Sequence, residues 1–149
     1  MEKVFGITPA SSAPYIFILV FSVVLLALIG LFIYIGYSAR YLSFQLNDDG
    51  LRIGPGLYGR FIPREQIDAG GVRVVDLNVE TNLKPKRRTN GVGMPGYAAG
   101  WFKLQNDEKA LMFVTDRSRV VYLPTRQGYS LLMSTPEAEE FAELIRHWD

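Results

Sequence analysis

YIFILVFSVVLLALIGLFIYIGY, residues 15–37, contains no charged side chain and divides this sequence into parts of different character. As an α-helix it would measure roughly 34 Å, enough to cross the ~30 Å hydrocarbon core of a bilayer with slight tilt. Tyr15, Tyr34 and Tyr37 suit the two membrane interfaces. We therefore expect an N-terminal tail (residues 1–14), one transmembrane helix (15–37) and a polar domain (38–149).

The alternative to a retained anchor is a cleaved signal peptide, because residues 36–38 offer a small-x-small cleavage pattern. Signal-peptide apolar regions usually run about 7–15 residues, however, and this run is longer. Lys3 precedes the run, and Arg40 and Arg52 follow it. Since Lys and Arg are enriched on cytoplasmic flanks, we expect a single-pass protein of the cell membrane with its C-terminal domain in the cytoplasm.

The overall composition excludes several function classes. There are 16 Lys and Arg residues against 15 Asp and Glu, a formal net charge of +1. A general nucleic-acid binder would carry a stronger positive field, so no nucleic-acid partner is expected. Cysteine is absent, which excludes disulfides, thiolate metal sites and a Cys nucleophile.

Short segments with strand patterns follow the anchor. In residues 41–46, Leu42, Phe44 and Leu46 alternate with Tyr, Ser and Gln, as in a half-buried strand, and the turn-forming residues 47–50 come next. The same reasoning predicts strands at 51–53, 57–62, 72–77, 101–105, 109–114, 119–123 and 129–133.

A helix is predicted to close the domain. Ser134 and Thr135 are N-cap candidates, Pro136 suits the first turn, and acidic residues follow near the positive end of the helix dipole. One apolar stripe is spaced for packing on the strands: Phe141, Leu144, Ile145 and Trp148. The fold class is thus mainly β, an antiparallel barrel or sandwich of about seven strands capped by a C-terminal helix and preceded by one transmembrane helix.

Residues 78–100 show no strand or helix pattern and predict a long loop, a length that often signals function. Lys84, Lys86, Arg87 and Arg88 place four positive charges within five residues. Such a run attracts phosphate or an anionic membrane surface. The alternative is a solvated loop that pairs locally with Asp76 and Glu80.

Glycines follow the basic run, and residues 91–96 match Gly-x-Gly-x-x-Gly. A dinucleotide site needs a strand before this motif and a helix after it, and Pro95 opposes the helix. The segment is better explained as a Gly-rich loop, with a ligand- or partner-facing role as the alternative. The candidate contacts in that role are Asn90, Gly91, Gly93, Gly96 and Tyr97.

No residues predict catalysis, a metal or a cofactor. His147 is the one histidine and lies at the end of the predicted helix, where the helix dipole favours it. The acidic pairs at 48–49 and 107–108 lie in predicted turns, where Asp is expected for backbone reasons. We therefore expect no catalytic and no metal-binding residues.

Several stretches resemble the membrane-anchored members of the bacterial pleckstrin homology (PH) domain family, for which function is largely unassigned. They are residues 49–53, 57–63, 88–97, 100–102 and 115–124. The resemblance covers nearly all of the polar domain and implies a β-barrel recognition module. Eukaryotic PH domains that bind phosphoinositides use a basic loop between their first two strands, whereas residues 47–50 here are acidic, so no lipid-binding residue is carried over.

Together these observations predict a non-enzymatic module, anchored to the lipid bilayer through residues 15–37, that binds a protein partner or associates with itself. The alternative is a sensor of anionic lipid or of a phosphorylated ligand. It would use the basic segment 84–88 and the Gly-rich segment 91–100.

Overall fold

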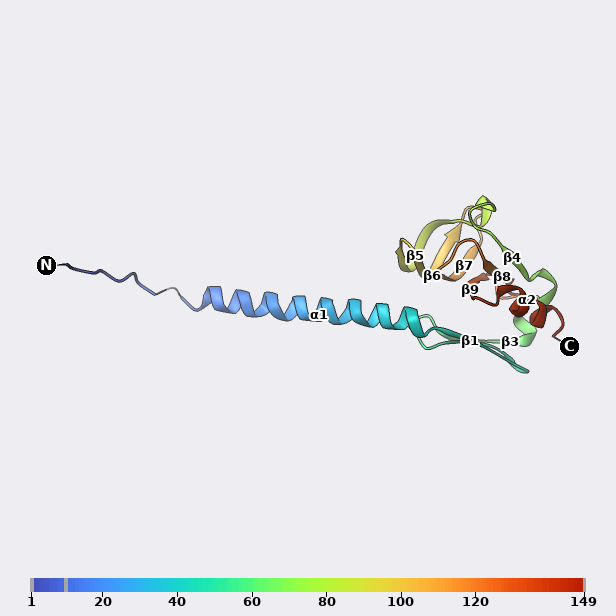
Figure 1. The fold of residues 1–149 in the computed structure, drawn as a ribbon, viewed down its shortest axis with the longest axis horizontal. Coiled ribbons are helices and arrows are strands. Elements are labelled where there is room, and N and C mark those ends of the chain that lie inside the picture. Colours follow the sequence, from blue (N-terminus) through green and yellow to red (C-terminus); the bar gives the residue numbers. More distant parts are fainter. Residues whose placement is uncertain (1, 10, 149) are drawn as a thin grey trace. The chain divides into compact units, whose positions relative to one another are not determined.

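The computed structural model describes residues 2–9 and 11–148, and the chain divides into two units between Tyr41 and Leu42. The elements in chain order are drawn in Figure 1. They are α1 (Ala13–Tyr41), β1 (Ser43–Asn47), β2 (Gly50–Gly54), β3 (Arg60–Pro63), η1 (Arg64–Gln66), η2 (Ala69–Gly71), β4 (Arg73–Val75), η3 (Thr81–Leu83), β5 (Pro85–Met94), β6 (Tyr97–Leu104), β7 (Lys109–Val114), β8 (Val120–Pro124), β9 (Ser130–Ser134) and α2 (Ala138–Arg146).

The first unit is built on one apolar helix. Its segment Ala13–Tyr37 contains an 18-residue window with a mean hydropathy of 3.3, and none of that window is buried within the protein, so the segment is long and apolar enough to cross a bilayer. The helix continues to Tyr41, and the positive charge of Arg40 in its last turn interacts favourably with the negative end of the helix dipole. The strand predicted from residue 41 therefore begins at Ser43 instead.

The second unit contains two sheets and α2, which confirms the predicted mainly β class. Three strands form one sheet in the order β1-β2-β3, and six form the other in the order β4-β8-β9-β7-β6-β5. Neighbouring strands are antiparallel except β7 and β9, which run parallel, with Leu111 opposite Leu131. This one pair departs from the predicted all-antiparallel arrangement.

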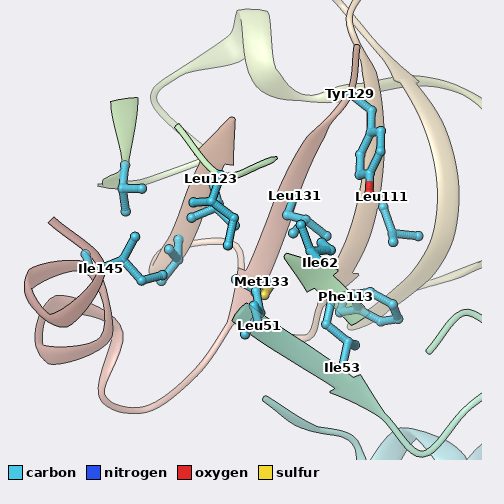
Figure 2. Packing of buried hydrophobic residues seen from close by; sticks show 14 of the residues in the cluster. Leu51, Ile53, Ile62, Leu111, Phe113, Leu123, Tyr129, Leu131, Met133 and Ile145 are labelled. Carbon is cyan, nitrogen blue, oxygen red and sulfur yellow. The ribbon is translucent and has the colours of Figure 1, made fainter. Parts of the chain in front are cut away.

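Both faces of the central strands of the six-stranded sheet are buried. Leu111 and Phe113 of β7 join a core that also holds residues of β2, β3 and α2 (Figure 2), while Met112 belongs to a second core on the opposite face. Leu77 and Leu83, from the connection between β4 and β5, complete the second core. Alternating positions are apolar on both sides, which explains why β7 and β9 read as continuous apolar runs.

The N-terminus of α2 differs from the prediction. Ser134 is the last residue of β9, and its Oγ accepts hydrogen bonds from the N–H groups of Thr115 and Asp116. Its hydroxyl is therefore engaged by another loop, and the N-cap position falls at Glu137 without a side-chain cap. Pro136 precedes the helix, while Glu139 and Glu140 lie in its first turn as expected.

The buried face of α2 is also displaced from the predicted stripe. Ile145 is fully buried, but Leu144 is 56% exposed, and Phe141 and Trp148 are half-buried. The remaining buried positions are Ala138 and Ala142. Small side chains on this face let the helix approach β4 and β8 closely, which leaves the larger apolar residues at its margin.

Candidate functional site

The basic run lies on a strand, not in the long loop that the sequence predicted. Residues 85–94 form β5, the edge strand that pairs with β6. β5 is exposed on both faces over residues 86–90 and carries few apolar side chains, so it has no alternating pattern to detect. β5 is therefore held by its hydrogen bonds to β6 and not by burial of its side chains.

The pairing of β5 separates the four basic residues. Arg87 is opposite Lys103, whereas Arg88 is opposite Phe102 of the second core and so faces the other way. Lys86 is an extra residue at a register shift, and Nζ of Lys86 lies 3.3 Å from a carboxylate oxygen of Asp107. Lys84 precedes the strand and is half-buried.

Gly91 and Gly100 are paired across β5 and β6, where the two backbones approach closely. A Cβ atom at Gly91 would lie 2.4 Å from the carbonyl oxygen of Ala99. Gly100 has φ +112°, and a Cβ there would lie 2.6 Å from the carbonyl oxygen of Asn90. Both glycines are therefore required by the hairpin backbone.

The other candidate contacts of the Gly-rich segment are distributed along the same hairpin. Gly93 is on β5, and Gly96 occupies the tight turn with φ +76°. The Asn90 side chain accepts a 3.2 Å hydrogen bond from the Tyr58 hydroxyl. Burial, with Tyr58 nearby, raises the pKa of Tyr97, so its phenol stays neutral at physiological pH.

A cationic surface that the sequence did not predict crosses β5, β6 and β7. Lys103 is opposite Arg87 on one side and Lys109 on the other, so these three cations, here named the basic row, share one face of the sheet. The predicted turn at 106–108 brings Lys103 and Lys109 together. Lys103 and Lys109 stand three residues before and one residue after that predicted turn, so the pairing of residues across the turn could have identified them from the sequence.

A hollow of about 580 Å³ lies beside the basic row. We name it the Trp101 hollow; its lining residues are Thr89, Asn90, Trp101, Phe102, Lys103, Asp107 and Lys109. Nζ of Lys109 lies 4.4 Å from the centroid of the Trp101 ring, and the guanidinium carbon of Arg60 lies 4.8 Å from it. Tyr129 packs edge-on against the same ring at 5.0 Å. Two cations are thus gathered around one aromatic side chain.

Asp107 is the one carboxylate that lines this hollow. It pairs with Lys86 and, at 3.6 Å, with Lys103. The hydrogen bond from Lys86 and the two positive charges hold the pKa of Asp107 below its usual value of 3.8, so it is ionised at neutral pH. Its φ of +68° places it at the left-handed position of the turn, which Asp tolerates.

A second hollow, named here the β1–α2 groove, lies between the edge strand β1 and helix α2 and has a volume of about 360 Å³. Its apolar lining includes Leu42, Phe44, Phe141 and Leu144, and the rings of Phe44 and Phe141 are 6.5 Å apart in an edge-on arrangement. Glu137 and Glu140 supply its acidic side chains. This groove was not predicted, because it depends on how far α2 lies from β1.

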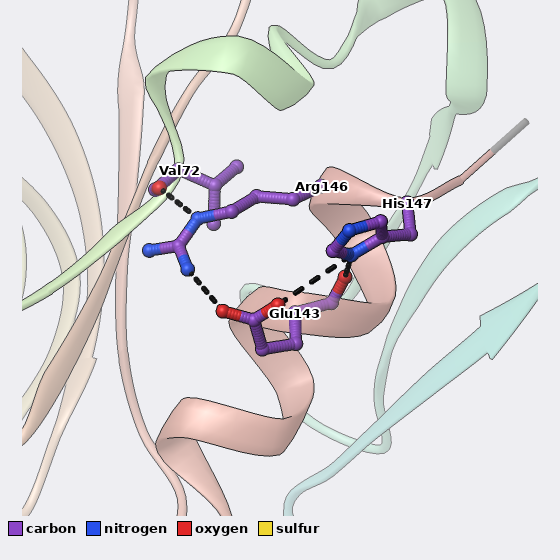
Figure 3. A network of polar contacts seen from close by, with 4 residues as sticks. All are labelled: Val72, Glu143, Arg146 and His147. Atoms are coloured by element: carbon purple, nitrogen blue, oxygen red, sulfur yellow. Dashed lines mark hydrogen bonds and ion pairs between the residues drawn. The ribbon is translucent and has the colours of Figure 1, made fainter.

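His147 occupies the exposed end of α2, as predicted. Its Nδ1 lies 3.0 Å from the Glu143 carbonyl oxygen and 3.5 Å from the Glu143 carboxylate (Figure 3). Arg146 donates to Glu143 and, through Nε, to the carbonyl oxygen of Val72. These contacts attach the helix end to the segment before β4.

Comparison with known families assigns the domain. The family model described as Bacterial PH domain matches residues 42–148. The chain belongs to the bacterial PH domain family. No curated protein and no solved structure matches it. The PH domain therefore spans the whole unit that follows α1, and together with that apolar helix it is consistent with a membrane-anchored module.

Across residues 2–9 and 11–148, no group of three or more His, Cys, Asp or Glu residues is placed to hold a metal ion.

Proposed function

We propose that this protein is a single-pass membrane protein whose PH domain acts without catalysis, by binding a segment of another protein in the β1–α2 groove. The carrying observation is the free edge of β1 beside an apolar groove. Within the described residues β1 has one strand partner, β2, so its other edge has backbone N–H and C=O groups left to pair. An extended segment can add to such an edge as a further strand.

The shape and chemistry of the groove support this mode of binding. The five residues of β1 are SFQLN and carry no charge that would repel an added strand. Phe44 and Phe141 form an aromatic floor for an apolar side chain of the segment, and Leu144, 56% exposed, forms part of the wall. Backbone hydrogen bonds supply affinity in this mode, and pockets for alternate side chains supply specificity.

The acidic side chains of the groove indicate the charge of the partner. Glu137 and Glu140 are exposed, and neither forms an ion pair with any residue that the structure describes. Glu139, by contrast, is held by Arg119. We expect the bound segment to carry Lys or Arg beside its apolar residue, because complementary charges steer association.

Self-association is the form of this proposal in which a second copy supplies the segment. The experiment below separates this form from binding of a different protein by the mass of the product.

We also propose the tail, anchor and domain limits 1–14, 15–37 and 38–149, with the domain in the cytoplasm. The support is the larger number of basic residues after the anchor, Arg40 and Arg52 against Lys3. Protease added to intact cells and to lysed cells tests the orientation: the domain should be cut only after lysis. Cleavage in intact cells would overturn it.

Site-specific photocrosslinking in membranes tests the groove. A photoreactive residue replaces Leu144 in the full chain, and a control chain carries it at Leu57, which is 68% exposed in the loop between β2 and β3. We expect a discrete product at 144 that is lost when Glu137→Lys and Glu140→Lys are introduced together. A matched charge reversal outside the groove, Glu65→Lys, should leave the product unchanged.

A product of twice the chain mass identifies self-association, and any other discrete mass identifies a separate protein. The proposal fails if position 144 gives no more product than position 57. It also fails if the product persists after both glutamates are reversed.

A second candidate function, sensing of anionic lipid or a phosphorylated ligand through segment 84–88, has one observation in its favour. Arg87 and Arg88 are exposed, and neither pairs with a carboxylate among the described residues. Charge reversal at Lys86, Arg87 and Arg88 in the full chain, with binding measured to vesicles of anionic and of neutral lipid, tests it. Salt-sensitive binding lost on reversal supports this function, and binding that persists excludes it.

A further inference from the structure

We propose that the basic row and the Trp101 hollow together form a binding site for a phosphate monoester group, carried either by a small soluble ligand or by a phospholipid headgroup. This site is on a different surface from the β1–α2 groove, and it does not depend on the groove's being occupied. Its residues are Arg87, Lys103, Lys109 and Trp101.

The register of the strands is the first argument. Arg87, Lys103 and Lys109 are directly opposite one another on three adjacent strands. Directly opposite side chains in an antiparallel pair have Cβ atoms about 4.5–5.5 Å apart, and like charges at that separation are destabilising. The fold therefore keeps an unfavourable arrangement that a bound anion would relieve.

Protection of the sheet edge does not explain this arrangement. Charged residues commonly blunt an edge strand against pairing with another chain, which is a sufficient reason for Arg87 and Arg88 on β5. Lys103 and Lys109 are on β6 and β7, however, and both of these strands have neighbours on each side. Charges placed there protect no edge.

The charge balance around the hollow is the second argument. Asp107 is the one carboxylate among the lining residues, and it is shared between Lys86 and Lys103. Within the part of the chain that the structure describes, Lys109 and Arg87 have no carboxylate within ion-pair distance. A group with two negative charges fits this excess better than a single carboxylate does. A phosphate monoester carries about −1.5 to −2 at pH 7.

The shape of the hollow is the third argument. Its volume of about 580 Å³ is within the usual range for small-molecule sites, about 300–1,000 Å³. The half-buried Trp101 ring gives it an apolar wall, and the ammonium of Lys109 is held over that ring. The Thr89 hydroxyl, which also lines the hollow, donates to the Trp101 carbonyl oxygen at 3.1 Å and so holds β5 against β6 beside the ring. The wall would accommodate the ester group while the lysines bind the phosphate.

Fluorescence of Trp101 tests the site in the full chain, held in nanodiscs of phosphatidylcholine. Trp148→Phe removes the one other tryptophan and retains an aromatic ring beside Arg64. In one arm glycerol phosphate is added as the soluble probe. In the other arm the nanodisc contains phosphatidic acid, whose headgroup is a phosphate monoester. We expect a saturable change in Trp101 emission in the first arm if the ligand is soluble, or in the second arm alone if it is a lipid.

Paired variants identify the residues responsible. Lys103→Gln with Lys109→Gln should weaken binding by about 10- to 100-fold, because each lysine makes a charge-assisted bond to the phosphate. Arg117→Gln with Arg126→Gln removes the same charge from exposed positions outside the site and should change binding less than about twofold. Asp107→Asn should tighten binding by about two- to fivefold, because it removes the negative charge beside the ligand.

The proposal is overturned if neither probe changes Trp101 emission. It is also overturned if the lysine pair and the arginine pair weaken binding equally, since that outcome indicates only the general field of the protein. Thermal unfolding of each variant confirms that the domain is folded, and isothermal calorimetry with glycerol phosphate checks the soluble arm without fluorescence. Photocrosslinking at Leu144 should be unchanged in the lysine pair, so failure of this site and failure of the groove are separate results.

Discussion

The edge strands β5 and β1 differ in their length, charge and regularity of pairing. β5, an edge of the six-stranded sheet, is ten residues long, carries Lys86, Arg87 and Arg88, and is interrupted by two register shifts. β1, an edge of the three-stranded sheet, is five residues long, uncharged and bordered by an apolar groove. Charges and irregular pairing discourage the addition of a strand, whereas a regular neutral edge permits it. The comparison supports the proposals of strand addition at β1 and of charge-based binding at the surface beside β5.

Removing the attachment of α2 should damage the β1 side most. Ile145→Ala deletes a fully buried side chain of the core that joins α2 to the sheets, and should lower the free energy of unfolding by about 2–5 kcal/mol. The neighbouring change Leu144→Ala, at a side chain 56% exposed, should cost less than about 0.5 kcal/mol. Urea unfolding of the full chain in detergent measures both, and equal costs would contradict the observed packing of α2.

The hairpin on the β5 side depends on Gly100. Gly100→Ala imposes φ +112° on a residue with a side chain and brings its Cβ within 2.6 Å of backbone atoms. We expect a loss of about 2–3 kcal/mol in unfolding free energy. Gly96→Ala, in an open turn at φ +76° with no atom within 4 Å, should lose about 1 kcal/mol. Thermal and urea unfolding can rank the two, and a larger loss at Gly96 would show that the close approach of β5 and β6 is wrong.

Charge reversal within the basic row should stabilise the domain and abolish binding of the phosphate monoester. In chains that also carry Asp107→Asn, which removes the carboxylate paired with Lys103, Lys103→Glu places a negative charge directly between Arg87 and Lys109 and should raise the free energy of unfolding by about 0.2–1 kcal/mol. The same change should abolish binding of glycerol phosphate or phosphatidic acid. Arg117→Glu, outside the row, serves as the control for a simple change of net charge. A loss of stability in Lys103→Glu would contradict the repulsion inferred from the register.

The smallest effect concerns pH and Asp107. Because the positive groups around it lower its pKa in the folded state, its contribution to stability is present above the unfolded pKa near 3.8 and is lost as pH falls through the folded pKa. Asp107→Asn tolerates the same backbone conformation and lacks this titration. The difference in unfolding free energy between the two proteins should be constant near neutral pH and disappear in acid. A difference that is independent of pH would show that the carboxylate does not interact with Lys86.

The sequence predicted the elements that carry a strong apolar signal and missed those that do not. The span and strands such as β7 were predicted from continuous apolar runs, and α2 from apolar residues at the helical period. β5 has polar residues on both faces followed by glycines, so its strand conformation depends on pairing with β6. Propensity and periodicity carry no information about such a strand.

The candidate residues show the same division. The sequence identified the charges of segment 84–88 but placed them together in one loop, whereas the strand directs Arg87 and Arg88 to opposite faces. Lys103 and Lys109 were not predicted, because their importance comes from the register across a turn. The β1–α2 groove depends on the position of α2, which is set by Ala138, Ala142 and Ile145 in the core.

The parallel pairing of β7 with β9 also constrains how the domain is made. β9 lies between β7 and β8, so among the described residues it is through strand residues 130–134 that the β5–β6–β7 hairpins pair with the β4–β8 half of the sheet. These residues are synthesised late, long after residues 15–37 have left the ribosome. If α1 enters the membrane as it emerges, the domain completes its fold at the bilayer surface. Until β9 is in place, the exposed strands of the incomplete sheet are then held at that surface.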